Sequence, residues 1–397
     1  MRMNPHMLQT IAPPIVEAQR WLERPTRDLS RPLLNLSQAA PVGLPALSLR
    51  KHIAEFLMKE TAAHAYGPVL GNQDLREAIA ELWTELYGGD IAASQVALTS
   101  GCNQAFTAAV TALAKAGEAV MLCSPMYFNH RMWLDMLGIE ARMLEVDESM
   151  QPSPEQASRL IDDRLRAIVL VTPNNPTGAE YPPALLREFY VLARRNGLAL
   201  IVDETYRDFV RDPDSLHKLF QEPRWERTLV HLYSFSKAYR LTGHRLGAVV
   251  ASPDLLFEIE KYMDTVAICA NQIAQRAAVF AIRHLQPWLD QERARISRRR
   301  RAVESGFAQM QEWTLRGCGA YFAYVRHPFD VPSDEVVLQL LDQQNMLMLP
   351  DTLFASRESS REGVEFGRHL RIAFANVGVS DIRQFFVRLN EFRLPQA

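Results

Sequence analysis

The sequence predicts an α/β protein with a large, mostly parallel sheet covered by helices on both faces, followed by a smaller α+β unit. Short, continuously apolar runs alternate with amphipathic helical stretches, which is typical of strands buried on both faces. After Gly306 the apolar and polar residues instead alternate, as in half-buried strands. The chain has 397 residues, too many for one hydrophobic core, so we expect two domains.

The predicted strands of the large sheet are short runs rich in Val, Leu, Ile and Ala, each bounded by polar or turn residues. They are Val96–Leu98, Ala119–Cys123, Ala167–Val171, Leu198–Val202, Leu229–Leu232 and Leu246–Val250. Helices are predicted at Asn103–Lys115 and Pro183–Asn196, between successive strands. The gap from Leu232 to Leu246 is too short for a crossover helix, so we expect the last strand to be antiparallel to its neighbours.

The segment from Pro253 to about Gly306 is predicted to be almost wholly helical. It contains the basic run Arg298–Arg301, which could be a solvated helix face or a nucleic-acid patch. The formal net charge of −2 favours the solvated face.

The smaller unit is predicted to contain two strands and two helices, with both helices beginning at serine caps. The strands are Ala320–Val325 and Leu370–Phe374, and the helices are Ser333–Gln344 and Ser380–Phe392. Five prolines lie in the first 30 or so residues, which we expect to form an arm. We therefore divide the chain into an arm with part of the small domain (1–45), a large domain (46–290) and a small domain (291–397).

Composition excludes several classes of function. With 44 basic and 46 acidic residues, the chain has no global field that would attract nucleic acid or an anionic membrane. It has no uncharged apolar stretch of bilayer length, and its N-terminus lacks a signal-peptide core, so we predict a cytoplasmic location. The four cysteines, Cys102, Cys123, Cys269 and Cys318, form no CxxC pair, and we expect them to be reduced, with no metal site.

Polar residues follow four of the predicted strands. In open α/β sheets, ligands bind beyond the carboxyl ends of the strands, so these residues are candidates for one site. The segments are Thr99–Asn103, Thr172–Gly178, Asp203–Tyr206 and Ser234–Lys237, the last followed by Arg245. Together they offer an anion site, an amide, a carboxylate, a phenol, a lysine and an arginine.

The turn at Gly101 precedes a helix and could bind an anion with free backbone N–H groups. A simple helix cap explains the same residues. Neither GxGxxG nor GxxxxGK[ST] occurs in the chain, so dinucleotide and P-loop binding lack their main support.

Lys237 is either an ordinary surface charge or an amine made nucleophilic by a second cation such as Arg245. Asp203 ends the apolar run LALIVD, where it either meets a cation or caps the next helix. A lysine, an anion site and a carboxylate are what pyridoxal phosphate needs. Asn175 and Tyr206 could hold the phenolic oxygen of its ring. These residues therefore predict pyridoxal 5'-phosphate as cofactor.

Seven motifs occur in an order that resembles a known family. They are YGPVLGNQDLREAI (66–79), TSGCNQA (99–105), SPMY (124–127), PNNPTG (173–178), VDETY (202–206), SFSKAYRLTGHRLG (234–247) and RIAFAN (371–376). The chain resembles fold-type I pyridoxal-phosphate enzymes, in particular class I/II aminotransferases, from about Leu34 to Phe392. The resemblance implies an aspartate aminotransferase-like fold, with a mostly parallel seven-stranded sheet sandwiched by helices and a smaller α+β domain.

The resemblance also implies a role for each matching residue. Lys237 would form an aldimine with the cofactor and move the proton at the substrate Cα. Asp203 would pair with the pyridinium nitrogen, and Asn175 and Tyr206 would hold the phenolic oxygen. Tyr127 would stack on the ring. The phosphate would be held by Gly101, Cys102, Asn103, Ser234 and Arg245. Arg371 would bind the substrate carboxylate, near Asn175 and Ala39. Tyr66 would reach the partner's cofactor in a homodimer.

The chain departs from the family pattern in two places. Ala39 replaces the usual glycine near the substrate carboxylate, and Asp351 replaces the glycine that usually follows the proline at 350. The motifs supply no second arginine for a distal carboxylate, so they do not predict a preference for aspartate or glutamate. Tyr321, Phe322 and Phe354 could line the side-chain pocket or belong to the core of the small domain.

The sequence thus predicts an aminotransferase that moves an amino group from an L-amino acid to a 2-oxo acid, with no nucleic-acid or membrane partner. The nearest alternative is a lyase, cyclase or synthase with the same fold and cofactor. A cofactor-sensing regulator would need a DNA-reading module, and only about 33 residues precede the matching region.

Overall fold

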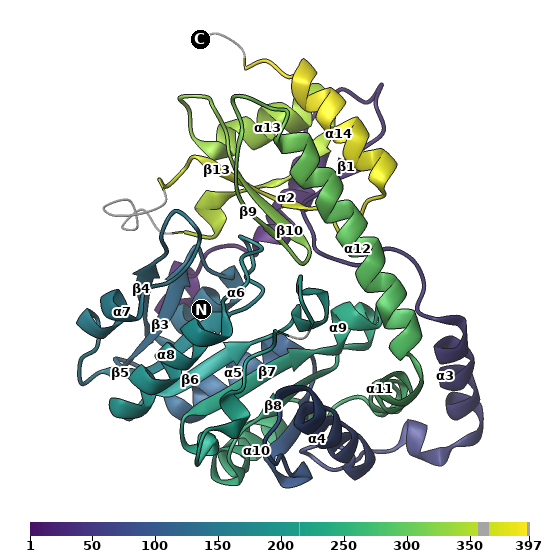
Figure 1. Ribbon diagram of the computed structural model, residues 1–397, viewed down its shortest axis with the longest axis vertical. Helices are drawn as coiled ribbons and strands as arrows, with labels where there is room; N and C mark the ends of the chain where they lie inside the picture. The colour runs from purple at the N-terminus through teal and green to yellow at the C-terminus, as the bar shows by residue number, and fades with distance from the viewer. Residues whose placement is uncertain (214, 356–364, 395–397) are drawn as a thin grey trace.

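The computed structural model describes residues 1–213, 215–355 and 365–394, which form two lobes (Figure 1). Residues 356–364 and 395–397 of the predicted small domain lie outside the described residues. The larger lobe is built on a seven-stranded sheet and the smaller on a four-stranded sheet.

The large sheet has the strand order β2-β8-β7-β6-β5-β3-β4. Its strands are β2 (Val96–Thr99), β3 (Ala119–Ser124), β4 (Glu140–Glu145), β5 (Leu165–Val171), β6 (Ala199–Asp203), β7 (Leu229–Ser234) and β8 (Gly247–Val250). Strand β8 is antiparallel to both β2 and β7, as the short connection predicted, and the other pairs are parallel. Strand β4 was not predicted from the residues, because this half-buried edge strand carries three charged side chains.

Helices cover both faces of this sheet (Figure 1). One face packs against α4 (Gln73–Tyr87), α8 (Pro183–Arg195) and α11 (Gln272–His284). The other packs against α5 (Cys102–Leu113), α6 (Phe128–Leu137) and α10 (Pro253–Ala267). The remaining helices of this lobe are α3 (Leu47–Lys59), α7 (Pro154–Arg159) and the short α9 (Phe235–Ala238). The predicted two-sided α/β sheet is therefore confirmed.

The predicted helical segment 253–306 consists of three helices, since the chain breaks at Ile268 and at Leu285. Its third helix, α12 (Gln286–Phe307), runs from the large lobe into the small one (Figure 1).

The small lobe contains the antiparallel sheet β12-β13-β10-β9. Its elements are β9 (Thr314–Gly319), β10 (Phe322–Arg326), α13 (Ser333–Gln344), β11 (Met346–Leu347), β12 (Leu349–Pro350), β13 (His369–Ala373) and α14 (Val379–Glu391). The prediction of serine caps was wrong, because Ser333 and Ser380 both lie within the first turn. The N-caps are Pro332 and Gly378, and the Asp381 side chain accepts a bond from the Gly378 N–H.

The N-terminal segment is more structured than a plain arm. It forms two short helices, α1 (Pro5–Gln9) and α2 (Pro14–Arg20), and a two-residue strand, β1 (Leu34–Asn35). Strand β1 pairs in parallel with β11, which joins the segment to the small lobe. Among the described residues, no helix is both long enough and apolar enough to cross a membrane.

Candidate active site

The carboxyl ends of the central strands surround a cavity of about 460 Å³, a volume in the range of small-molecule sites. It brings together most of the predicted site residues from all four segments. Those that line it are Ala39, Cys102, Asn103, Tyr127, Asn175, Asp203, Tyr206, Ser234, Lys237 and Arg245. Gly101 and Arg371 contact this lining, whereas Tyr66 does not lie in it.

Lys237 is held in the short helix α9, and its side chain points into the cavity. Its Nζ donates a 2.5 Å hydrogen bond to the carbonyl oxygen of Ala39. Burial, together with the positive charges of Arg245 and Arg371, lowers the pKa of Lys237 to about 8. The neutral, nucleophilic amine is therefore far more accessible than in an exposed lysine.

Asp203 ends β6 and presents a buried carboxylate to the same cavity. Its Oδ1 accepts the Thr205 N–H at 3.0 Å and lies 3.5 Å from the Cys102 Sγ, and its Oδ2 lies 3.4 Å from the His130 Nε2. Burial raises the pKa of Asp203, but His130 and Thr205 outweigh burial, so that the net pKa lies below its usual value. The carboxylate is therefore anionic at neutral pH, as a partner for a cationic ring nitrogen must be.

The part of the cavity at the start of α5 is suited to an anion. Helix α5 begins after Gly101, and its first-turn N–H groups have no partner within the helix. A Cβ at Gly101 would lie 2.2 Å from Nη2 of Arg245, so only glycine allows this guanidinium to reach the helix start. Arg245 Nη1 donates to the Thr242 carbonyl at 3.1 Å, and Ser234 and Ser236 line the same end.

Arg371 is buried on β13 and reaches from the small lobe to the cavity. Its Nη1 donates a 3.0 Å hydrogen bond to Oδ1 of Asn175, and its Nη2 donates to the carbonyl of Ser37. An arginine can only donate, so this bond fixes the orientation of the Asn175 amide. The Nδ2–H₂ group of Asn175 is therefore left to donate elsewhere.

Two tyrosines provide ring surfaces beside these groups. Tyr127 precedes α6, and its hydroxyl donates to Oδ1 of Asn103 at 3.3 Å. The ring centroid of Tyr206 lies 5.6 Å from Nζ of Lys237. Burial raises the pKa of Tyr127 to about 12 and that of Tyr206 well above its ordinary value, so both phenols keep their protons.

Tyr66 is placed differently from every other predicted residue. It lies in the segment between α3 and α4, and its side chain is 81% exposed. It therefore takes no part in the cavity of its own chain.

Asp351, which replaces the glycine usual in the family, joins two parts of the small lobe. Its buried carboxylate accepts Ser333 Oγ at 2.6 Å and the N–H groups of Gly367 and His369 at 3.0 and 3.2 Å. These bonds join the start of α13 to the turn before β13, the strand that carries Arg371. Tyr321, Phe322 and Phe354 are fully buried, which agrees with a place in the core.

Sequence reasoning missed several residues of the site. His130 contacts Asp203 and stacks on Phe106 at 3.8 Å, but its position near Asp203 depends on the packing of α6 against α5. Ser236 lies within the SFSK motif, two residues after Ser234, so the motif itself could have suggested it. Gln38 and Ala40 flank Ala39 in the lining and come from an irregular segment without a periodic signal.

Comparisons with known proteins agree with this geometry. A family model described as aminotransferase class I and II matches residues 31–389. An aromatic aminotransferase of Arabidopsis thaliana is 27% identical over 374 residues, covering 92% of this chain and 90% of that protein. An aspartate aminotransferase of Thermotoga maritima is 27% identical over 288 residues, covering 72% and 74% of the two chains.

Solved structures show the same fold. A structure of Thermus thermophilus aspartate aminotransferase with maleate superposes with a TM-score of 0.88 at 23% identity, covering 98% of this chain and 100% of that one. The aspartate aminotransferase-like fold expected from the motifs is therefore confirmed.

Proposed function

Because this chain belongs to the class I and II aminotransferases, which use pyridoxal 5'-phosphate, we propose that the cavity around Lys237 is the site where it transfers amino groups. The observation that carries the assignment is a single cavity with a lysine of lowered pKa, a buried carboxylate at Asp203 and an anion-binding end at Gly101 and Arg245. The overall reaction moves an amino group from an L-amino acid to a 2-oxo acid.

The residues present fit the cofactor. The α5 N-terminus, Ser234 and Arg245 would hold the phosphate, and Gly101 gives this end the space that a Cβ would fill. Asp203 would hold the ring nitrogen, and Tyr127 would cover a face of the ring. When bound, pyridoxal phosphate supplies an aldehyde that links to an amine and a protonated ring that withdraws electrons from the substrate Cα.

Lys237 supplies the amine and the base. Its lowered pKa lets Nζ lose a proton near neutral pH, which frees the lone pair of the amine and would let it carry a proton at the substrate Cα. The Ala39 carbonyl accepts from Nζ and so aims the amine into the cavity.

The polar residues around the ring site hold protons in fixed places. The anionic Asp203 favours a proton on the ring nitrogen facing it. The protonated Tyr206 and the Nδ2–H₂ group of Asn175 would donate to the phenolic oxygen. The guanidinium of Arg371 would bind the substrate α-carboxylate as a planar fork and so set which Cα bond faces the lysine.

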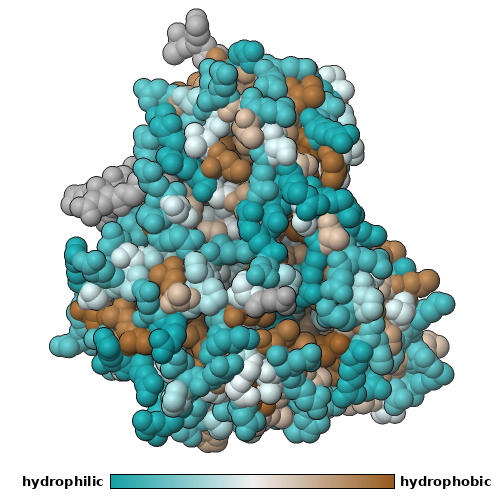
Figure 2. All heavy atoms as spheres, in the orientation of Figure 1, coloured by the Kyte–Doolittle hydropathy of each residue, from teal (hydrophilic) through white to brown (hydrophobic). Residues whose placement is uncertain are grey.

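We also propose that the active unit is a homodimer in which Tyr66 reaches the partner's site. Met58 and Tyr66, close in the chain, are 83% and 81% exposed, which favours an interface on this side of the large lobe. On the face in Figure 2, which is largely hydrophilic, hydrophobic residues gather in patches over the same lobe. We further propose domain boundaries near residues 46 and 290 and a cytoplasmic location.

A spectroscopic screen tests the transfer function. Purified protein loaded with pyridoxal phosphate is mixed with single amino acids, including phenylalanine, tyrosine and aspartate, the classes for which the relatives are named. We expect the visible cofactor band to convert to that of pyridoxamine phosphate with release of an equal amount of 2-oxo acid. Ammonia release with the original band retained would instead identify a lyase.

A further inference from the structure

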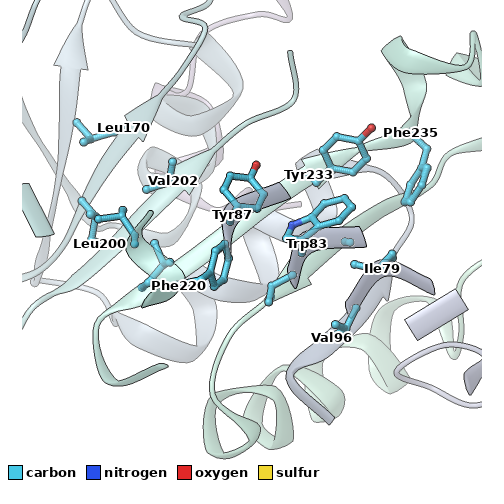
Figure 3. Packing of buried hydrophobic residues seen from close by; sticks show 14 of the residues in the cluster. Ile79, Trp83, Tyr87, Val96, Leu170, Leu200, Val202, Phe220, Tyr233 and Phe235 are labelled. Atoms are coloured by element: carbon cyan, nitrogen blue, oxygen red, sulfur yellow. The ribbon is translucent and has the colours of Figure 1, made fainter. Parts of the chain in front are cut away.

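A cluster of buried polar residues lies on the face of the large sheet covered by α4, against the segment that carries Asp203. It consists of Tyr87 on α4, Glu204 directly after β6, His217, and His231 on β7, and all four side chains are buried. We call it the Glu204 cluster. Figure 3 shows Tyr87 beside Trp83, Phe220 and Tyr233 in the surrounding packing. No residue of the cluster lines the cavity.

Hydrogen bonds fix the proton positions of both histidines. The indole N–H of Trp83 donates to Nδ1 of His231 at 3.3 Å, and the backbone N–H of Leu219 donates to Nδ1 of His217 at 3.3 Å. A neutral imidazole that accepts at Nδ1 carries its proton on Nε2. Both Nε2–H groups therefore face Glu204, whose Oε2 lies 2.8 Å from His231 Nε2 and 3.5 Å from His217 Nε2.

The Tyr87 hydroxyl donates to the same oxygen of Glu204, and Arg207 Nη1 donates to the Tyr87 oxygen at 3.3 Å. Burial raises the pKa of Glu204, but the facing histidines outweigh it, so that the pKa lies well below its usual range. The cluster is thus a buried carboxylate anion that accepts hydrogen bonds from Tyr87 and His231, with His217 close by.

A metal ion does not fit this arrangement, although Glu204, His217 and His231 could bring three ligand atoms within 4.8 Å of one another. A histidine that binds a metal through Nε2 donates its other N–H to an acceptor. Here both Nδ1 atoms accept instead, so both Nε2 atoms carry protons and have no lone pair to offer.

The cluster also holds the residues that follow Glu204. The Arg207 guanidinium lies 4.0 Å from the Trp83 ring centroid and 4.4 Å from that of Tyr233. The Tyr233 hydroxyl donates to Asp208 at 2.7 Å. The segment 203–208 therefore has two sides. Asp203, Thr205 and Tyr206 line the cavity, whereas Glu204, Arg207 and Asp208 are buried away from it.

We propose that Glu204 is a positioning residue, whose bonds to His231 and Tyr87 hold Asp203 and Tyr206 at the geometry that the cofactor ring requires. This inference rests on the proposed function, because it assigns Asp203 and Tyr206 to the cofactor. Glu204 acts only through its neighbours, since it touches neither the cavity nor the reacting groups.

The test replaces the anion with an isosteric neutral group, Glu204→Gln, and measures cofactor binding apart from turnover. We expect the dissociation constant of pyridoxal phosphate, followed by absorbance, to rise about tenfold and kcat to fall by about 10- to 100-fold, with a smaller change in KM. Tyr87→Phe removes one hydroxyl and keeps the ring, so we expect a smaller change in the same direction. If Glu204→Gln does not fold, the cofactor affinity and kcat of Tyr87→Phe test the proposal instead.

The matched control is Glu292→Gln. Glu292 is also buried, where it accepts bonds from Arg240 and Arg295, but it lies on α12 and does not line the cavity. We expect this variant to lose stability while its cofactor affinity stays within about twofold of wild type.

The outcomes separate the two proposals. Wild-type protein that gives no visible band with pyridoxal phosphate overturns the proposed function and this inference together. Wild-type protein that binds the cofactor and transfers amino groups, while Glu204→Gln and Tyr87→Phe do so equally well, overturns only this inference. A loss of cofactor affinity in Glu292→Gln as large as that in Glu204→Gln would also overturn this inference.

Discussion

The Arg371 guanidinium donates a 3.0 Å hydrogen bond to the Asn175 side chain, joining residues 196 positions apart in the chain. The bond crosses from β13 of the small lobe to the loop after β5 of the large lobe. The group proposed to bind the substrate and one proposed to orient the ring are therefore coupled directly.

Arg371→Lys tests this coupling. Lysine keeps the charge but loses the planar fork, so it cannot bind a carboxylate and Asn175 in the same geometry. We expect kcat/KM for amino acids to fall by about 100-fold or more, while the visible band of the bound cofactor remains. Steady-state kinetics and the absorbance spectrum measure the two effects. An unchanged KM for the amino acid would contradict the proposed carboxylate site.

Gly101→Ala tests the anion-binding end. The new Cβ would lie 2.2 Å from Arg245 Nη2, at a backbone φ of +88°. We expect the cofactor dissociation constant to rise by about 100-fold, because the guanidinium must leave the α5 N-terminus.

Gly117→Ala is the matched control for that change. Gly117 has nearly the same φ, +85°, but a Cβ added there would meet nothing within 4 Å. We expect a loss of about 1 kcal/mol in stability from backbone strain and unchanged cofactor affinity. Equal cofactor affinities in the two variants would show that displacement of Arg245 does not weaken cofactor binding.

Lys237→Met should abolish cofactor attachment and turnover, yet stabilise the cofactor-free protein at neutral pH. The folded protein holds the lysine cation at a cost, since its pKa there is about 8 instead of 10.5. Below pH 8 the amine is protonated in both states, so we expect the variant to be more stable by about 3 kcal/mol. This advantage should shrink as pH rises from 8 to 10.5, where the folded amine has already lost its proton. Denaturant unfolding across this pH range measures the trend.

His130→Phe tests the support of Asp203. Phenylalanine keeps the stack on Phe106 but removes the ring nitrogen 3.4 Å from Oδ2. The pKa of Asp203, which burial raises and His130 lowers, should rise in the variant. The anionic form is lost as pH falls through this pKa, so cofactor affinity in the variant should decline at a higher pH than in wild type. Identical pH profiles of the dissociation constant would show that His130 does not act on Asp203.

A mixed-subunit experiment tests the role of Tyr66. Lys237→Ala and Tyr66→Ala proteins are each expected to be impaired, but a hybrid dimer contains one site with both native residues. Random mixing should therefore restore roughly a quarter of wild-type activity. No recovery after confirmed subunit exchange would place Tyr66 outside the partner's site.

The sequence predicted the central sheet well because its strands are buried on both faces, which leaves an unbroken apolar run such as Ala167–Val171 within β5. It did not predict β4, since an edge strand with one solvated face keeps charged residues such as Glu140 and Arg142. The serine caps were wrong because Ser333 donates to Asp351 instead of capping α13.

Prediction of the site residues likewise succeeded where the signal is local and failed where it depends on tertiary packing. Residues that lie in local motifs, such as Lys237 and Asn175, could be assigned from the sequence. His130 could not, because its relation to Asp203 exists only after α6 packs against the sheet. The Glu204 cluster was also unpredictable, since its members come from α4, the end of β6, β7 and the loop at His217.

The stretch from Leu34 to Ala39 pairs with β11 at its start and lines the cavity around Lys237 at its end, through Gln38 and Ala39. Its carbonyl at Ser37 receives Arg371, and its carbonyl at Ala39 receives Lys237. A recombinant protein trimmed to begin at the large domain would thus lose the backbone acceptors of its two key cations. Such a shortened protein would retain every side chain of the seven motifs, but Lys237 and Arg371 would lose these hydrogen-bond acceptors. Trimming for crystallisation should therefore stop before Leu34.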